Sequence, residues 1–182
     1  MTQLQQLGKR AKRASVQLLQ LTEKEKKEAL QTIARHLREK ESFLVKENDK
    51  DIVHARENGI DEAIIDRLLL NQERLEDIAD AVEAISLLPN PLGEVIEEIT
   101  HENGLQITRK RVPLGVVGMV YEARPNVTVD AAALALKTSN AIILRGSSSA
   151  LHSNKALVSV MQEALRSTKV PVEAIQLIED TS

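Results

Sequence analysis

The sequence contains no cysteine and no tryptophan, and its aromatic side chains are one Phe and one Tyr among 182 residues. Without cysteine, the chain has neither a disulfide framework nor thiolate ligands for a metal ion. So few aromatic rings leave little on which nucleic-acid bases could stack, and a net charge of −3 provides no basic excess for phosphates. We therefore expect no nucleic-acid partner.

Long apolar runs are missing as well. No run approaches the roughly 20 residues of a membrane span, and the start, MTQLQQLGKRAKR, lacks the apolar stretch of a signal peptide. Thr2 stands where N-myristoylation would need glycine. The four histidines are scattered, and the G-x-S-x-G, P-loop and H-E-x-x-H patterns are absent. We expect a cytoplasmic protein with no membrane segment and no metal site.

The chain does have a 42% hydrophobic content, built from Leu, Ile, Val and Ala. Up to residue 88 the apolar residues follow helical spacing. Thr22 and Glu25 have the spacing of a capping box, and Asn71 is a predicted N-cap for a later helix. We assign residues 1–88 to an amino-terminal helical segment.

Residues 89–113 begin with a break in the helical pattern, the proline- and glycine-containing stretch LPNPLG. Two β-rich runs follow, joined at Asn103-Gly104, a pair that predicts a two-residue type I′ turn because both residues tolerate positive φ. We interpret this segment as a linker and a long β-hairpin. Such a hairpin either covers a sheet edge or supplies one to another chain.

From residue 114 to 182 the pattern changes to strands alternating with helices. The run VVGMVY predicts a strand buried on both faces, AIILRG a second and EAIQLIED a third. The intervening helices are expected from about Val129 to near Asn140, and over ALHSNKALVSVMQEALRST. This βαβαβ order predicts an α/β fold with half of a Rossmann-like, doubly wound parallel sheet. Because such sheets normally continue, we expect a truncated domain.

Ligands of doubly wound sheets collect at the carboxyl ends of the strands, and the stretch EARPNVT follows the first strand. Asn126 either caps the following helix or donates its amide N–H to an oxyanion forming on a carbonyl substrate. Pro125 stiffens the turn. Arg124 either clamps a phosphate or carboxylate, or forms a salt bridge with Glu122 or Asp130.

After the second strand come Arg145, Gly146, Ser147, Ser148 and Ser149. A cation at this position suits the 2′-phosphate of NADP, whereas NAD-binding folds usually present an acid there. The alternative is a helix-entry loop with a surface arginine. No G-x-G-x-x-G follows the first strand, which argues against the common dehydrogenase-type dinucleotide site.

Four stretches, VPLGVVGMVYEARPNVTVDAAALALK, NAIILRG, QLIEDTS and DRLLL, resemble the aldehyde dehydrogenase superfamily and, within it, the γ-glutamyl phosphate reductase family. The resemblance spans the chain, and it implies that residues 1–88 are the helical segment of a cofactor domain and residues 114–182 part of its NADP-binding region. Its most specific part is EARPNVT, because other members of the superfamily carry a proline-tryptophan-asparagine turn there.

The resemblance implies NADPH-dependent reduction of γ-glutamyl phosphate to glutamate-5-semialdehyde and phosphate, a step of proline biosynthesis. It also implies a cysteine nucleophile that forms an acyl-enzyme, and a homo-oligomer assembled through a β flap matching the hairpin at residues 94–112. Asn126 matches the oxyanion donor, and Arg145 the basic residue that meets the adenosine ribose. The family gives Arg124 no role; its contact with the substrate anion is inferred from position.

Two features depart from this pattern. The family has Gly-Gly-Ser-Glu after the arginine, where this chain has Gly146, Ser147, Ser148 and Ser149, so an acceptor for a ribose hydroxyl is lost. The catalytic cysteine is missing too, and thiolate attack needs sulfur. We therefore expect an amino-terminal portion that is inactive alone. The alternative is a non-catalytic nucleotide-binding or interaction module, complete as it stands.

Overall fold

The computed structural model describes residues 2–180, and within them a helical half precedes a mixed half. The first half contains α1 (Gln3–Leu18), α2 (Glu23–Glu39), α3 (Glu41–Glu57), α4 (Glu62–Leu68) and α5 (Gln72–Leu87). The second contains β1 (Val95–Thr100), β2 (Gln106–Lys110), β3 (Val116–Val120), α6 (Pro125–Lys137), β4 (Ala141–Arg145), η1 (Ser148–Ala150), α7 (Leu151–Leu165), η2 (Val172–Ala174) and β5 (Ile175–Leu177).

The parallel sheet has the strand order β3-β4-β5. Its register pairs Val116 with Ala141 and Val120 with Arg145, so β3 and β4 end together at one edge of the sheet. The expected α/β architecture of amino-terminal helices, an antiparallel hairpin and a parallel three-stranded sheet is confirmed. The third strand is shorter than expected, because residues Val172–Ala174 form a 3₁₀ turn.

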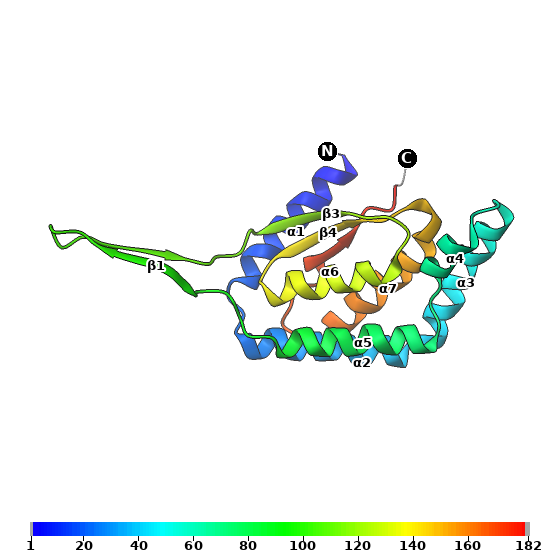
Figure 1. Ribbon diagram of the computed structural model, residues 1–182, viewed down its shortest axis with the longest axis horizontal. Helices are drawn as coiled ribbons and strands as arrows, with labels where there is room; N and C mark the ends of the chain where they lie inside the picture. Colours follow the sequence, from blue (N-terminus) through cyan, green and yellow to red (C-terminus); the bar gives the residue numbers. More distant parts are fainter. Residues whose placement is uncertain (1, 181–182) are drawn as a thin grey trace.

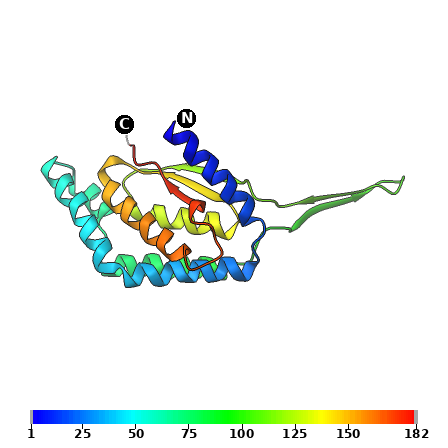
Figure 2. The ribbon, with the colours of Figure 1, turned by 180° about the vertical axis from the view of Figure 1, so that it is seen from behind.

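The helices pack in layers around this sheet. One face contacts α1 and the other contacts α6 and α7, and beyond these lie α2 and α5, which pack along each other (Figures 1 and 2). The hairpin β1–β2 projects away from this body in both views. The largest fully buried side chains come from the helices and β4: Leu18, Leu30, Ile33, Leu37, Leu44, Leu68, Leu75, Leu136, Ile142, Leu144, Leu157 and Met161. Each contributes about 1.5–3 kcal/mol relative to an exposed position. All of them except Leu68 lie in one core that the helical half and the sheet share, and Leu68 belongs to a smaller cluster beside α3 and α4.

Local capping signals hold in the structure. The Thr22 hydroxyl accepts from the Glu25 N–H at 3.3 Å, and the Glu25 carboxylate accepts from the Thr22 N–H at 2.8 Å, which completes the predicted capping box. Asn71 Oδ1 accepts from the Arg74 N–H at 2.8 Å, as an N-cap does. These helix starts depend on residues within one turn of each other, which is why sequence spacing predicts them.

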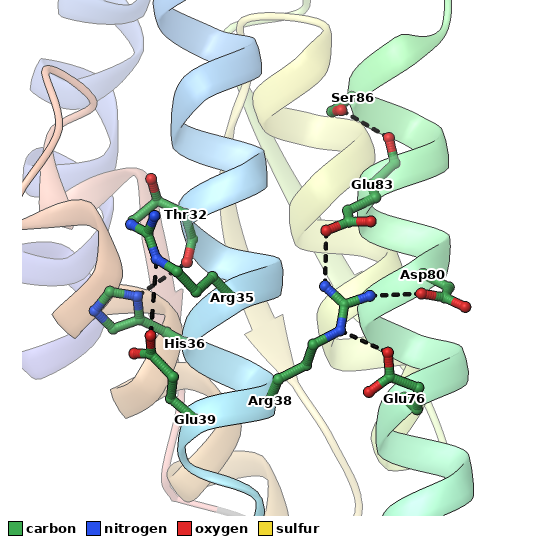
Figure 3. Close-up of polar contacts among 9 residues, drawn as sticks. All are labelled: Thr32, Arg35, His36, Arg38, Glu39, Glu76, Asp80, Glu83 and Ser86. Carbon is green, nitrogen blue, oxygen red and sulfur yellow. Dashed lines mark hydrogen bonds and ion pairs between the residues drawn. The ribbon is translucent and has the colours of Figure 1, made fainter.

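A single arginine joins the two outer helices. Arg38 of α2 donates from Nε to Glu76 at 2.6 Å, from Nη2 to Asp80 at 2.5 Å and from Nη1 to Glu83 at 2.7 Å (Figure 3). The three acids lie along one face of α5, spaced so that each reaches a different nitrogen of the guanidinium. The carboxylates, Glu83 foremost, raise the pKa of Arg38. This contact adds an ionic link to the apolar packing of α2 against α5.

The turn of the hairpin differs from the predicted type I′ geometry. The loop between His101 and Leu105 has three residues, closed by the His101 N–H donating to the Leu105 carbonyl at 2.9 Å. Gly104 has a φ of 86°, whereas Asn103 is not among the described residues with positive φ. Instead, Asn103 Oδ1 accepts from the Leu105 N–H at 3.1 Å. That side-chain bond, typical of Asn, stabilises the three-residue loop.

Strand β3 is also less buried than predicted. Val116, Val117 and Met119 are half-buried, and Val120 is 73% exposed. The prediction of burial on both faces is therefore wrong, because β3 is an edge strand of the described sheet. In doubly wound sheets the edge beside the first strand is where the fourth strand is added.

Candidate functional site

The turn after β3 leads directly into α6. Pro125 occupies the first turn of the helix, where its missing N–H costs nothing and its fixed φ favours entry. The N-cap position is held by Arg124, and no side chain makes a cap hydrogen bond there. The predicted helix start near Val129 is therefore wrong by a full turn. Asn126 lies inside the helix and is not its N-cap.

Asn126 is exposed and its amide is held from one side. Its Nδ2 donates to Asp130 Oδ2 at 3.2 Å, one helical turn further on. An amide nitrogen carries two N–H groups, and among the described residues the second has no partner. Burial raises the pKa of Asp130, while the hydrogen bond from Asn126 lowers it. The geometry thus presents one amide N–H to solvent at the amino end of α6, where the helix dipole is positive.

Arg124 and Asn126 line the same cleft, which has a volume of about 360 Å³. The cleft lies between the amino end of α6 and the wall formed by α4 and α5; it is lined by Asp66, Arg67, Leu69, Leu70, Arg74, Asp77, Ile78, Ala81, Arg124, Pro125, Asn126 and Asp130. Arg124 is exposed and forms no ion pair with another described residue, so the alternative salt bridges with Glu122 and Asp130 are not formed. Composition and spacing did not point to Arg67, Arg74, Asp77 or Asp130. One signal that could have found two of them was overlooked: Arg74 and Asp77 share a helical face with Ile78 and Ala81.

A buried hydrogen-bond chain anchors this turn. The Tyr121 hydroxyl lies 2.6 Å from Thr128 Oγ1, which donates to Asn154 Oδ1 of α7 at 2.8 Å. Thr128 and Asn154 are buried, and burial raises the pKa of Tyr121. Because the chain ties the end of β3 to both α6 and α7, it holds the backbone on which Asn126 is mounted.

Arg145 ends β4 and lies in a different cleft. Its carbonyl accepts from the Tyr121 N–H at 3.1 Å, and its side chain helps line a cleft of about 350 Å³ with Glu179, Asp180 and the start of α1. Lys155 pairs with Glu179 at 2.6 Å, which places a second cation beside this cleft. Cations with a nearby carboxylate acceptor fit a ribose phosphate.

The loop after Arg145 is arranged differently from a simple phosphate cradle. A Cβ on Gly146 would lie 2.2 Å from Asn154 Nδ2, so any larger residue there would have to displace the Asn154 side chain. Ser147 caps the following 3₁₀ turn, accepting from the Ser149 N–H at 3.3 Å, and its hydroxyl lies 2.8 Å from that of Ser149. Ser148 is exposed and lines another cleft, beside α3. The structure therefore places Arg145 and Ser148 in separate clefts.

No helix within residues 2–180 is long and apolar enough to cross a membrane. In the same range, no three His, Cys, Asp or Glu side chains gather as a metal site would require.

The fold agrees with one class of protein. The family model described as "Aldehyde dehydrogenase family" matches residues 2–182, and the chain belongs to this family.

Within that family, the similar proteins share one description. The chain is 57% identical over 182 residues to "Gamma-glutamyl phosphate reductase" of Geobacillus kaustophilus. The alignment covers 100% of this chain and 44% of that protein. The same values apply to the Bacillus subtilis protein of that description. A crystal structure of γ-glutamyl phosphate reductase from Thermotoga maritima matches with a TM-score of 0.95 at 42% identity, over 100% of this chain and 44% of that one. The chain thus spans less than half the length of these relatives, and the resemblance read from its motifs is confirmed.

Proposed function

We propose that this chain supplies the substrate-carbonyl and cofactor-ribose contacts of an NADPH-dependent γ-glutamyl phosphate reductase. The reaction reduces γ-glutamyl phosphate to glutamate-5-semialdehyde and releases phosphate, in proline biosynthesis. One observation carries the proposal: the Asn126 amide presents an unpartnered N–H beside a cleft lined by arginines, at the carboxyl end of a strand. The descriptions of the similar proteins support it.

Asn126 acts on the carbonyl oxygen of the substrate. When a thiolate attacks the acyl carbon, a C–S bond forms and the carbonyl π pair moves onto oxygen, which then needs hydrogen-bond donors. One N–H of Asn126 is held by Asp130 at 3.2 Å, which orients the amide, and the other donates to the oxyanion. The positive end of α6 favours the same charge. Collapse of the oxyanion then expels phosphate.

Arg124 contacts the substrate anion. It is two residues from Asn126, exposed, and free of ion pairs with other described residues. A guanidinium at this place pairs with the phosphoryl oxygens of the acyl phosphate and stabilises the departing phosphate. In this role Arg124 is a binding and leaving-group residue.

The cofactor contacts belong to the end of β4. Aldehyde dehydrogenase family members use nicotinamide cofactors, and such a cofactor supplies the hydride when bound. We assign Arg145, with the adjoining Gly146 and Ser147, to the adenosine ribose and its 2′-phosphate. Ser148, predicted from its place in the same loop, lines a different cleft and is left out of this assignment. The preference for NADPH is tested with the full-length protein by comparing NADPH and NADH before and after Arg145→Glu. An NADPH preference that survives this charge reversal would overturn the assignment of Arg145.

The nucleophile must come from elsewhere, since the chain has no cysteine. We propose that the isolated 182 residues have no reductase activity. The same absence supports a second candidate, a non-catalytic nucleotide-binding module. Binding of NADPH by the isolated chain, together with a native gene that stops after Ser182, would favour that second candidate.

The decisive test of the first candidate is Asn126→Ala in the full-length protein. We expect turnover to fall about 10²–10³-fold, or about 2.7–4 kcal/mol, because one oxyanion donor is lost. Asp130→Asn, which keeps a hydrogen-bonding group but alters the hold on the amide, should have a smaller effect. Unchanged turnover in Asn126→Ala would leave Asn126 as a surface residue of α6.

We also propose that the hairpin β1–β2 joins copies of this protein into a homo-oligomer. All residues of both strands are exposed, including Ile96, Ile99 and Ile107. An isolated two-stranded hairpin is marginally stable in water, and its outer edges are unpaired. A second copy of the chain would cover the exposed isoleucines and pair with the outer edges of the hairpin.

A further inference from the structure

The cleft beside Asn126 has a charged wall that the reaction chemistry does not use. On α5, Arg74, Asp77, Ile78 and Ala81 follow at the spacing of one helical face, and all four line the cleft. Arg67 of α4 lines it too. Residues from two helices are therefore brought to one surface facing the amino end of α6.

The charges of this wall are not equally engaged. Arg74 is held by the end of α4: its Nη2 donates to Asp66 Oδ1 at 2.7 Å and its Nη1 to the carbonyls of Asp66 and Leu69. Arg67 and Asp77 form no hydrogen bond or ion pair with any other side chain that the structure describes, and both are exposed. In this wall, opposite Arg124, one cation and one anion are thus available to a ligand.

An α-amino acid head group carries the complementary pair of charges, a carboxylate that suits Arg67 and an ammonium that suits Asp77. We propose that Arg67 binds the α-carboxylate and Asp77 the α-ammonium of the γ-glutamyl substrate, an assignment that rests on the proposed function for the identity of the substrate. A carboxylate facing Arg67 gains a charge-assisted, bidentate contact, and an ammonium facing Asp77 gains another. A site for phosphate alone would not place Asp77 in the wall, because like charges repel.

The remaining surface of the cleft suits the rest of the substrate. Leu69, Ile78 and Ala81 provide apolar contact for the methylene groups between the head group and the acyl carbon. A volume of about 360 Å³ lies at the lower end of the range for small-molecule sites, roughly 300–1,000 Å³. Arg67 and Asp77 would thus be specificity residues, and Asn126 would act at the reacting end.

The test is binding of three small ligands to the full-length protein by calorimetry: L-glutamate, glutarate, which lacks the amino group, and 4-aminobutanoate, which lacks the α-carboxylate. The wild type should bind L-glutamate about tenfold or more tightly than either of the others. Asp77→Asn should abolish the preference over glutarate. Arg67→Gln should abolish the preference over 4-aminobutanoate.

Two exposed residues that line no part of this cleft serve as matched controls. Glu73 lies one turn before Asp77 on α5, and Arg166 lies at the end of α7. The variants Glu73→Gln and Arg166→Gln should both leave the three affinities unchanged. A loss that is equal for the three ligands, or preferences that persist in Asp77→Asn and Arg67→Gln, would overturn the inference.

Activity separates this inference from the proposed function. Phosphate-dependent oxidation of glutamate-5-semialdehyde by the full-length wild type tests the reaction itself. If that activity is present and the ligand preferences do not respond to the substitutions, the head-group assignment fails and the reaction stands. If the activity is absent and the preferences respond as expected, the reaction fails, and the cleft remains an amino-acid site.

Discussion

At the scale of single residues, Gly146 shows how packing fixes a residue type. A Cβ there would lie 2.2 Å from Asn154 Nδ2 and 3.2 Å from Tyr121 Cε2. Gly146→Ala should therefore displace Asn154, break its bond with Thr128 and destabilise the protein by about 1–3 kcal/mol.

Gly8→Ala is the matched control: Gly8 lies inside α1, and nothing lies within 4 Å of its added Cβ. It should stabilise the protein by about 0.5–1 kcal/mol. Urea unfolding of the two variants measures both effects, and equal effects would contradict the packing argument.

Glu25 gives a prediction that depends on pH. A hydrogen bond from Lys169, together with those from Thr22, lowers the pKa of Glu25 from 4.5 to about 2. A carboxyl group with a lowered pKa in the folded state contributes stability that is full above its unfolded pKa and lost as the pH falls through the folded pKa. The coupling between Glu25 and Lys169 should thus be present at pH 7 and decline between about pH 4.5 and 2.

A double-mutant cycle of Glu25→Gln and Lys169→Met measures that coupling. Gln keeps the capping box with Thr22 but removes the charge, so the helix start is preserved. A coupling free energy that is the same at pH 7 and pH 2.5 would contradict the ionic origin of the contact.

Single residues also show how far the sequence can be read. Its motifs were sufficient to single out Asn126 and Arg124, and the structure places both in one cleft. The cap role that the sequence left open for Asn126 is excluded, because Arg124 holds the N-cap position and the helix starts one turn before the predicted start. Pro125 initiates the helix there, and the Asn126 side chain reaches forward to Asp130. A helix start that depends on φ of one proline is easily misjudged from apolar periodicity.

At the scale of elements, α7 starts without a cap of its own. Ala150 stands at its N-cap position, and the carboxylate of Asp51 on α3 takes over: it accepts from the His152 N–H at 3.1 Å, the Ser153 N–H at 2.8 Å and the Ser153 hydroxyl at 2.6 Å. Asp51→Ala should destabilise the protein by about 2 kcal/mol, because buried donors lose their acceptor near a positive helix end.

The neighbouring acid Asp49 provides the comparison for this cap. Asp49 is exposed on the same helix and makes no hydrogen bond with the described residues. Asp49→Ala should change the free energy of unfolding by no more than about 0.5 kcal/mol. Equal losses in the Asp51 and Asp49 variants would show that the interaction with α7 contributes nothing.

Elements differ in how well local patterns predict them. The capping box at Thr22 and the N-cap Asn71 were predicted correctly, because each contact closes within four residues. The cap from Asp51 escaped prediction, since its partners lie about 100 residues away. Apolar content of β3 likewise predicted two buried faces, yet Val120 is exposed. Its burial depends on which strand lies beside it, and strand order is not a local property.

At the scale of the whole molecule, the clefts are products of long-range packing. Arg67 and Asp77 line the same cleft as Asn126 because α5 packs against α6 and the end of α4 lies beside α5. Likewise, Arg145 and Ser148 are three residues apart and still line different clefts, because the chain turns between them. Motifs identify candidate residues, whereas the grouping of those residues requires the fold.

The hairpin poses the last question at this scale. It projects from the body (Figure 1), and its cross-strand pair Ile99 and Ile107 is 42% and 46% exposed. If copies of the protein assemble through this surface, replacing both residues by Lys should dissociate the oligomer, because two charges would be buried at the contact.

The adjacent pair Glu98 and Thr108 points to the opposite face of the hairpin, since side chains alternate along a strand. Lys at both of those positions changes the charge by +3, against +2 for the isoleucine variant, and keeps the isoleucines, so that variant should stay oligomeric. Sedimentation of the full-length wild type and both variants measures the mass directly. A monomeric wild type, or an oligomer that survives Ile99→Lys with Ile107→Lys, would exclude assembly through the isoleucine face.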